Sequence, residues 1–166
     1  MIYLIGAAAV AAAWRFGDWR HWERYYPTIL YLIIGDLTYN MLFQGHLLWK
    51  YQPEWMGPIL GSLFVMITAY PAMVLIYLSR FPNHALHAVF YVLAWVVLVG
   101  IIEWVLFSTG RIVYSGSWSL SKSLLVSLGM FLLLKLHYHR PLLVWPISFA
   151  LAFLLIWILP NSALPG

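Results

Sequence analysis

Two acidic side chains lie within long apolar stretches of this 166-residue chain and are its strongest candidates for chemistry. Asp36 lies in the stretch from 26 to 48, and Glu103 lies in the stretch from 86 to 108. An ionisable side chain inside a membrane is costly unless it is paired or hydrated, so such residues commonly mark a proton or ion site. The elements that position these two acids therefore decide what the chain can do.

Asp36 is expected to share one helical face with Tyr39 and Asn40, which follow it at i+3 and i+4. At a rise of 1.5 Å per residue, Asp36 would lie about 18 Å from the outer end of its helix, close to the bilayer midplane. Gly35 beside it should let another helix approach closely.

Tyr70 and Pro71 are expected at the same depth in the next helix, from 58 to 79. Because proline has no N–H, Pro71 leaves the carbonyl of Ile67 without its helical donor. We therefore predict a ligand- or ion-binding site formed by Asp36, Tyr39, Asn40 and Tyr70. In the alternative, which the sequence leaves open, Asp36 is protonated and hydrogen-bonded to a neighbouring helix, and it only holds the bundle together.

Glu103 is expected about 8 Å from the outer end of its helix. Lys122 lies at a similar depth, near the start of the stretch from 118 to 136. This spacing predicts a Glu103–Lys122 ion pair, with Arg111 as the competing partner and His46 nearby. The pair is interpreted either as a structural tie between two helices or as part of a binding site.

The remaining residues give no support for the catalytic, metal-binding or nucleic-acid-binding sites that are common in soluble proteins. The chain has no cysteine, so it has no disulfide and no thiolate metal site. Its histidine pairs, His84 with His87 and His137 with His139, are expected at a membrane interface, and we predict neither a metal site nor a cofactor. The sequence contains no G-x-S-x-G, H-E-x-x-H or phosphate-binding glycine loop, so an enzyme is not favoured. A net charge of +4 without a basic run also argues against nucleic-acid binding.

The composition indicates that lipid is the solvent for this chain. Hydrophobic residues make up 64% of it and charged residues 8%, whereas a soluble domain carries about a quarter charged residues. Crossing a bilayer takes about 20 apolar residues as a helix, and the apolar runs are continuous rather than alternating. We predict an all-α polytopic transmembrane bundle of six (or five) helices in a single domain covering 1–166. The candidate helices are 1–13, 26–48, 58–79, 86–108, 118–136 and 142–159.

The distribution of basic residues predicts the orientation in the membrane. Six of the nine Lys and Arg residues fall in or beside the loops after the first, third and fifth helices, and three fall on the other side. The positive-inside rule then places those three loops in the cytoplasm. The short, alanine-rich first stretch is the least certain to span, and Trp14 to Tyr25 after it has the pattern of a helix end in the membrane interface.

Two longer motifs resemble segments of a known protein family. One runs from Arg24 to Asn40 and is followed by a loop that contains Trp49, and the other runs from Ile102-Glu103 through Tyr114 to Leu143. Together they resemble a family of small, uncharacterised multi-spanning membrane proteins of endospore-forming Gram-positive bacteria, over helices two to six. The resemblance implies a location in the bacterial cell membrane and a helical fold, and it assigns no activity.

Three functions remain open from the sequence. The first is an accessory, sensory or partner-binding membrane subunit, acting with another membrane protein or with further copies of itself. The second is a small transporter or ion-conducting protein with Asp36 at its site. The third is a membrane-embedded enzyme acting on lipid, for which no constellation of side chains is evident.

Overall fold

The computed structural model describes residues 1–43, 47–52, 57–116 and 118–158, with the backbone alone considered at 58 and 155–158. The described part of the chain is helical apart from two three-residue strands and the connections. In chain order the elements are α1 (Ile2–Phe16), the 3₁₀ helix η1 (Trp19–Arg24), α2 (Tyr26–Leu42), β1 (Trp49–Tyr51), α3 (Pro58–Ser79), α4 (Ala85–Ser108), β2 (Ile112–Tyr114), α5 (Leu120–His139) and α6 (Pro141–Ile158).

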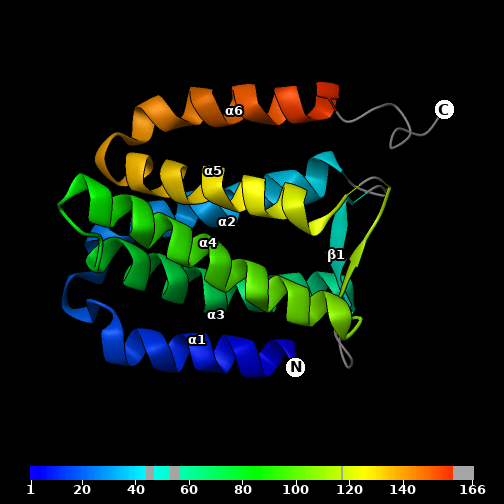
Figure 1. The fold of residues 1–166 in the computed structure, drawn as a ribbon, viewed down its shortest axis with the longest axis horizontal. Helices are drawn as coiled ribbons and strands as arrows, with labels where there is room; N and C mark the ends of the chain where they lie inside the picture. Colours follow the sequence, from blue (N-terminus) through cyan, green and yellow to red (C-terminus); the bar gives the residue numbers. More distant parts are fainter. Residues whose placement is uncertain (44–46, 53–56, 117, 159–166) are drawn as a thin grey trace.

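The helices lie side by side with their long axes roughly parallel (Figure 1). In that view α6 and α1 form the two outer edges, α5, α4 and α3 lie between them, and α2 lies behind. The chain reverses direction at each connection, so η1 and the α3–α4 and α5–α6 turns share one end. The strands β1 and β2 lie at the opposite end of the bundle, which we call the strand end.

Three described helices are long and apolar enough to cross a membrane, namely Ile59–Ser79, Ala85–Ser108 and Leu120–His139. Two further apolar helices, Ile2–Phe16 and Pro141–Leu154, are shorter in the described part of the chain. Most side chains of α4 point outward. Only 17% of the most apolar 18-residue segment of this helix is buried. Its exposed apolar residues include Leu86, Val89, Phe90, Leu93, Val97, Leu98, Ile101, Trp104 and Phe107. An apolar surface of this extent fits a helix in contact with lipid or with another protein.

The core lies between α2, α3, α4, α5 and α6. Tyr77 of α3 is fully buried at its centre, and its hydroxyl donates to the carbonyl oxygen of Phe131 in α5 at 2.9 Å. This bond gives the phenol a partner in a region where an unpaired polar atom would be costly. Leu75, Leu134 and Val144 pack in the same cluster.

Each α-helix overlaps one predicted stretch, and α3 has the predicted bounds. The clearest difference is α2, which ends at Leu42 instead of continuing to 48. Residues 44–46 within that prediction lie outside the described residues, as does the predicted last residue of the sixth helix at 159. Pro71 lies within α3, which continues through it.

The two strands, which the sequence analysis did not predict, pair antiparallel in the register Trp49↔Tyr114, Lys50↔Val113 and Tyr51↔Ile112. The ladder is extended on both sides, because Gln52 N donates to Arg111 O at 2.8 Å and Ser115 N donates to Leu48 O at 2.9 Å. Glycines with positive φ, Gly110 (69°) and Gly116 (60°), flank β2 and form the turns at its two ends.

Close helix contacts occur at glycines other than the predicted one. A Cβ atom at Gly35 would meet nothing within 4 Å, so the prediction that Gly35 admits a neighbouring helix is wrong. A Cβ at Gly6 of α1 would instead lie 2.5 Å from the Phe64 ring and 2.8 Å from Thr68 Oγ1 of α3. Gly6 therefore makes room for side chains of α3 at the α1–α3 contact, and Gly100 of α4 does the same for Leu124 of α5.

We expect Gly6→Ala to destabilise the protein and Gly35→Ala to leave it unchanged or slightly more stable. Both exchanges gain helix propensity, but only the first forces a methyl group into the Phe64 ring, at a cost of about 1–3 kcal/mol. Thermal unfolding of the detergent-solubilised variants measures the difference. Equal midpoints for the two variants would contradict the close α1–α3 packing.

Candidate functional site

Asp36 of α2 and Tyr70 of α3 are joined by a hydrogen bond between their side chains. The Tyr70 hydroxyl donates to Asp36 Oδ1 at 3.1 Å. Asn40, one turn after Asp36, donates from Nδ2 to Asp36 Oδ2 at 3.2 Å and to the Asp36 carbonyl oxygen at 2.8 Å. Both carboxylate oxygens thus accept a hydrogen bond from a neutral donor, and these three predicted site residues meet.

Tyr39 of α2 connects this helix to β1 through its contacts with Trp49. Its hydroxyl accepts the N–H of Trp49 at 3.2 Å and lies 3.4 Å from the Trp49 carbonyl oxygen, to which it donates. The two rings are stacked, with centroids 4.1 Å apart and planes at 10°. The chain must therefore fold back soon after α2 to bring Trp49 beside Tyr39.

This fold-back corrects the predicted depth of Asp36. Because α2 ends at Leu42, Asp36 lies six residues, or about 9 Å, from the end of its helix. The 18 Å depth assumed that the helix continued to 48. Tyr70 lies 12 residues into α3, and its long side chain extends to the Asp36 carboxylate.

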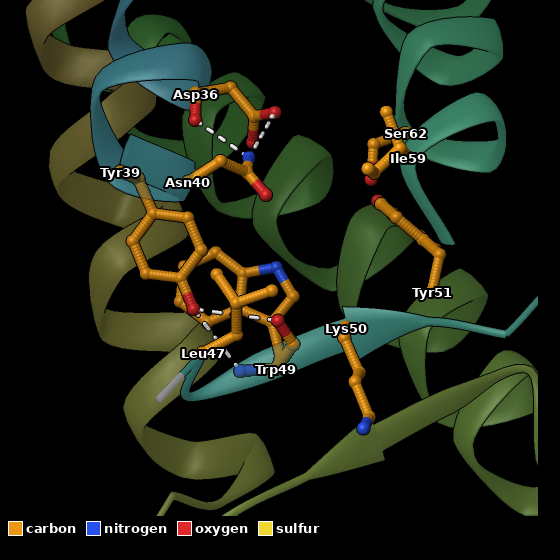
Figure 2. A pocket seen from close by; sticks show the side chains of 9 residues that line it. All are labelled: Asp36, Tyr39, Asn40, Leu47, Trp49, Lys50, Tyr51, Ile59 and Ser62. Atoms are coloured by element: carbon orange, nitrogen blue, oxygen red, sulfur yellow. Dashed lines mark hydrogen bonds between the residues drawn. The ribbon is translucent and has the colours of Figure 1, made fainter. Parts of the chain in front are cut away.

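The Asp36 carboxylate lines a cavity between α2, α3 and β1 at the strand end (Figure 2). The space open to water molecules in this cavity is about 50 Å³, whereas about 10–15 Å³ is enough for one water. Several waters or a small ion therefore fit, but a typical organic ligand, whose pocket measures about 300–1,000 Å³, does not. The cavity is lined by Asp36, Tyr39, Asn40, Leu47, Trp49, Lys50, Tyr51, Ile59 and Ser62.

Tyr51 of β1, which sequence reasoning missed, connects this cavity to the second acid. Its phenol interacts with that of Tyr70, and both Asp36 and Glu103 lie near enough to act on it electrostatically. Burial, followed by the two carboxylates, raises the pKa of the Tyr51 phenol above its ordinary value. Only the strand pairing places Tyr51 here, and a three-residue strand leaves no readable period in the sequence.

Glu103 is held by a phenol from the second strand. The Tyr114 hydroxyl of β2 donates to Glu103 Oε1 at 2.7 Å. Lys122 is exposed in the first turn of α5, and the Glu103–Lys122 ion pair stays a prediction. His46, expected nearby, lies outside the described residues.

A second buried polar cluster, also missed by sequence reasoning, lies at the other end of α2. His137 of α5 and Thr28 of α2 are both buried, and their side chains are hydrogen-bonded at 3.1 Å between Nδ1 and Oγ1. Tyr31 stacks on the His137 ring with centroids 4.3 Å apart and is hydrogen-bonded to Ser148 of α6 at 2.6 Å. His137 was predicted at the interface, but this cluster uses it to join three helices.

No group of three or more His, Cys, Asp or Glu side chains able to hold a metal ion occurs among the described residues. His84 and His87 do approach each other, with ring centroids 5.7 Å apart. The comparisons with known proteins add no assignment: no family model, no curated protein and no solved structure matches this chain.

We expect Tyr70→Phe to destabilise the protein by about 1–3 kcal/mol, because it leaves one Asp36 carboxylate oxygen without its donor. Tyr3→Phe is the matched control, because the Tyr3 hydroxyl is buried without a hydrogen-bond partner in the described part of the chain. The free energy of unfolding in detergent or bicelles measures both. A Tyr3→Phe loss as large as that of Tyr70→Phe would mean that the Tyr70–Asp36 bond contributes nothing.

Proposed function

We propose that this chain is a polytopic integral membrane protein that binds a proton or small cation at Asp36 and moves it across the bilayer. The observation that carries the proposal is the Asp36 carboxylate, which lines a cavity with room for several waters at the strand end. Its hydrogen-bond donors, Tyr70 and Asn40, are neutral, so neither cancels a negative charge on the carboxylate. An acid that lines a cavity with room for water and has neutral partners suits reversible binding of a cation or proton.

We also propose how the whole bundle is placed in the membrane. All six α-helices would cross the bilayer, with α1 and α2 spanning by local thinning of the membrane, since they have 15 and 17 residues. The loops after α1, α3 and α5 would face the cytoplasm of a bacterial cell, because six of the nine Lys and Arg residues lie toward that end. The family resembled by the two long motifs fits the same location.

A single small bundle offers little room for an enclosed pathway, so we also propose that the chain acts as a homo-oligomer or beside another membrane protein. This keeps an accessory, partner-binding role as the second candidate function. The observation that favours it is that both Asp36 oxygens already have partners within the chain. In that case Asp36 contributes stability and carries no ion.

Flux into proteoliposomes separates the two candidates. We expect the unmodified protein to conduct protons or alkali cations, and Asp36→Asn to abolish the flux while keeping the fold. The matched control is Glu23→Gln, which neutralises an exposed acid at the opposite end of the bundle. Flux that survives Asp36→Asn would overturn the proposal. No flux from any variant, with a lower unfolding midpoint for Asp36→Asn alone, would favour the accessory role.

The lack of native cysteine allows a direct test of orientation. Ser115→Cys places a thiol at the exposed strand end, and Asn83→Cys places one at the exposed α3–α4 turn. We expect an impermeant thiol reagent to label Ser115→Cys on intact cells and Asn83→Cys only after permeabilisation. The reverse pattern would invert the topology, and labelling of both on intact cells would exclude this arrangement of helices.

A further inference from the structure

Four oxygen-bearing side chains surround the cavity at Asp36. They are the Asp36 carboxylate and Asn40 amide from α2, the Ser62 hydroxyl from α3 and the Tyr51 phenol from β1. Because Asn40 Nδ2 donates to two oxygens of Asp36, the amide is oriented with its oxygen directed away from Asp36. Figure 2 shows the Tyr51 hydroxyl reaching in from β1 beside Ser62, across the cavity from Asn40.

The chemistry of these donors selects among cations. Carboxylate, amide, hydroxyl and phenol oxygens suit hard cations, whereas transition metals prefer imidazole or thiolate. Among the described residues, no His or Cys lines the cavity, and His46, which precedes the lining residue Leu47, lies outside them. A single carboxylate neutralises one positive charge, so a divalent ion would leave an uncompensated charge in a low-dielectric region. Figure 2 shows Lys50 extending away from Asp36, so its ammonium does not occupy the cavity.

The size of the cavity limits which cations can bind in it. A volume of about 50 Å³ holds a small ion and a few waters of its shell. The wall formed by β1 is fixed by the paired contacts of Trp49 with Tyr39, so the oxygens of Tyr51 and Asn40 face each other across a defined gap. A small alkali cation with part of its water shell fits this space.

We propose that the Asp36 cavity is a sodium site, in which Na⁺ is held by the side-chain oxygens of Asp36, Asn40, Ser62 and Tyr51, with water completing its shell. This inference rests on the proposed function and names the ion for that same residue. Binding requires a deprotonated carboxylate, so protons compete with Na⁺ for the site.

The test is a Na⁺ titration of the thermal unfolding of the purified full chain in a nonionic detergent, with choline chloride holding the ionic strength constant. We expect a saturating rise of the unfolding midpoint with Na⁺, because a ligand that binds the folded state stabilises it by mass action. The rise should be lost in Asp36→Asn. Ser62→Ala, a milder change, should weaken the apparent Na⁺ affinity by roughly three- to tenfold.

Ser79→Ala is the matched control, because the Ser79 hydroxyl donates to the Ile76 carbonyl oxygen of its own helix at the far end of α3. It should keep the affinity of the unmodified protein. An equal rise with KCl or choline chloride, or a Na⁺ response unchanged by Ser62→Ala, would overturn the sodium site. Proton flux that depends on Asp36 without any Na⁺ response would overturn this inference and leave the proposed function standing. Na⁺ stabilisation without flux would leave the sodium site standing and overturn the proposed transport function.

Discussion

The structure depends on one constraint: a backbone polar group that is shielded from water must find its partner within the protein. Helices meet this constraint internally, and the described chain is helical almost throughout. The two strands obey the same constraint at the strand end, where β1 and β2 satisfy each other over three residue pairs and the bonds of Gln52 and Ser115 extend the ladder. The backbone groups that join β1 to β2 thus find their partners within the protein.

Side chains follow the same constraint and turn it into contacts between helices. The buried hydroxyl of Tyr77 donates to Phe131, and that of Tyr31 is bonded to Ser148. Each bond gives a phenol a partner on another helix, so these polar groups join neighbouring helices. Asp36 is bonded in the same way by Tyr70, but it also lines a cavity, and this combination distinguishes it from the other ties.

The sequence predicted much of this arrangement because its strongest signals are physical. Each continuous apolar run overlaps one α-helix of the described chain, and the i+4 spacing placed Asn40 beside Asp36. Tyr70 does reach Asp36, although the equal depth on which that prediction rested was wrong. Two errors have different causes. The polar break Gln44-Gly45-His46 marks a helix end just beyond Leu42, and the prediction continued the helix through it. Tyr51 was missed because only the pairing with β2 places it by the cavity. Likewise, Gly35 was expected to face a helix, but the side of α2 on which it lies depends on tertiary packing.

The strand pair also explains how two acids from different helices belong to one region. Tyr114 of β2 donates to Glu103, and Tyr51 of β1 lies within the electrostatic reach of both Glu103 and Asp36. The strands thus carry one phenol toward each acid, and any shift of β1 against β2 changes the surroundings of both. Because β1 is fastened to Tyr39, one turn from Asp36, a movement of the strand end would be transmitted directly to the cavity wall. The strand pair and the Tyr39 contact therefore join β1, α2 and both acids in one connected region of the protein.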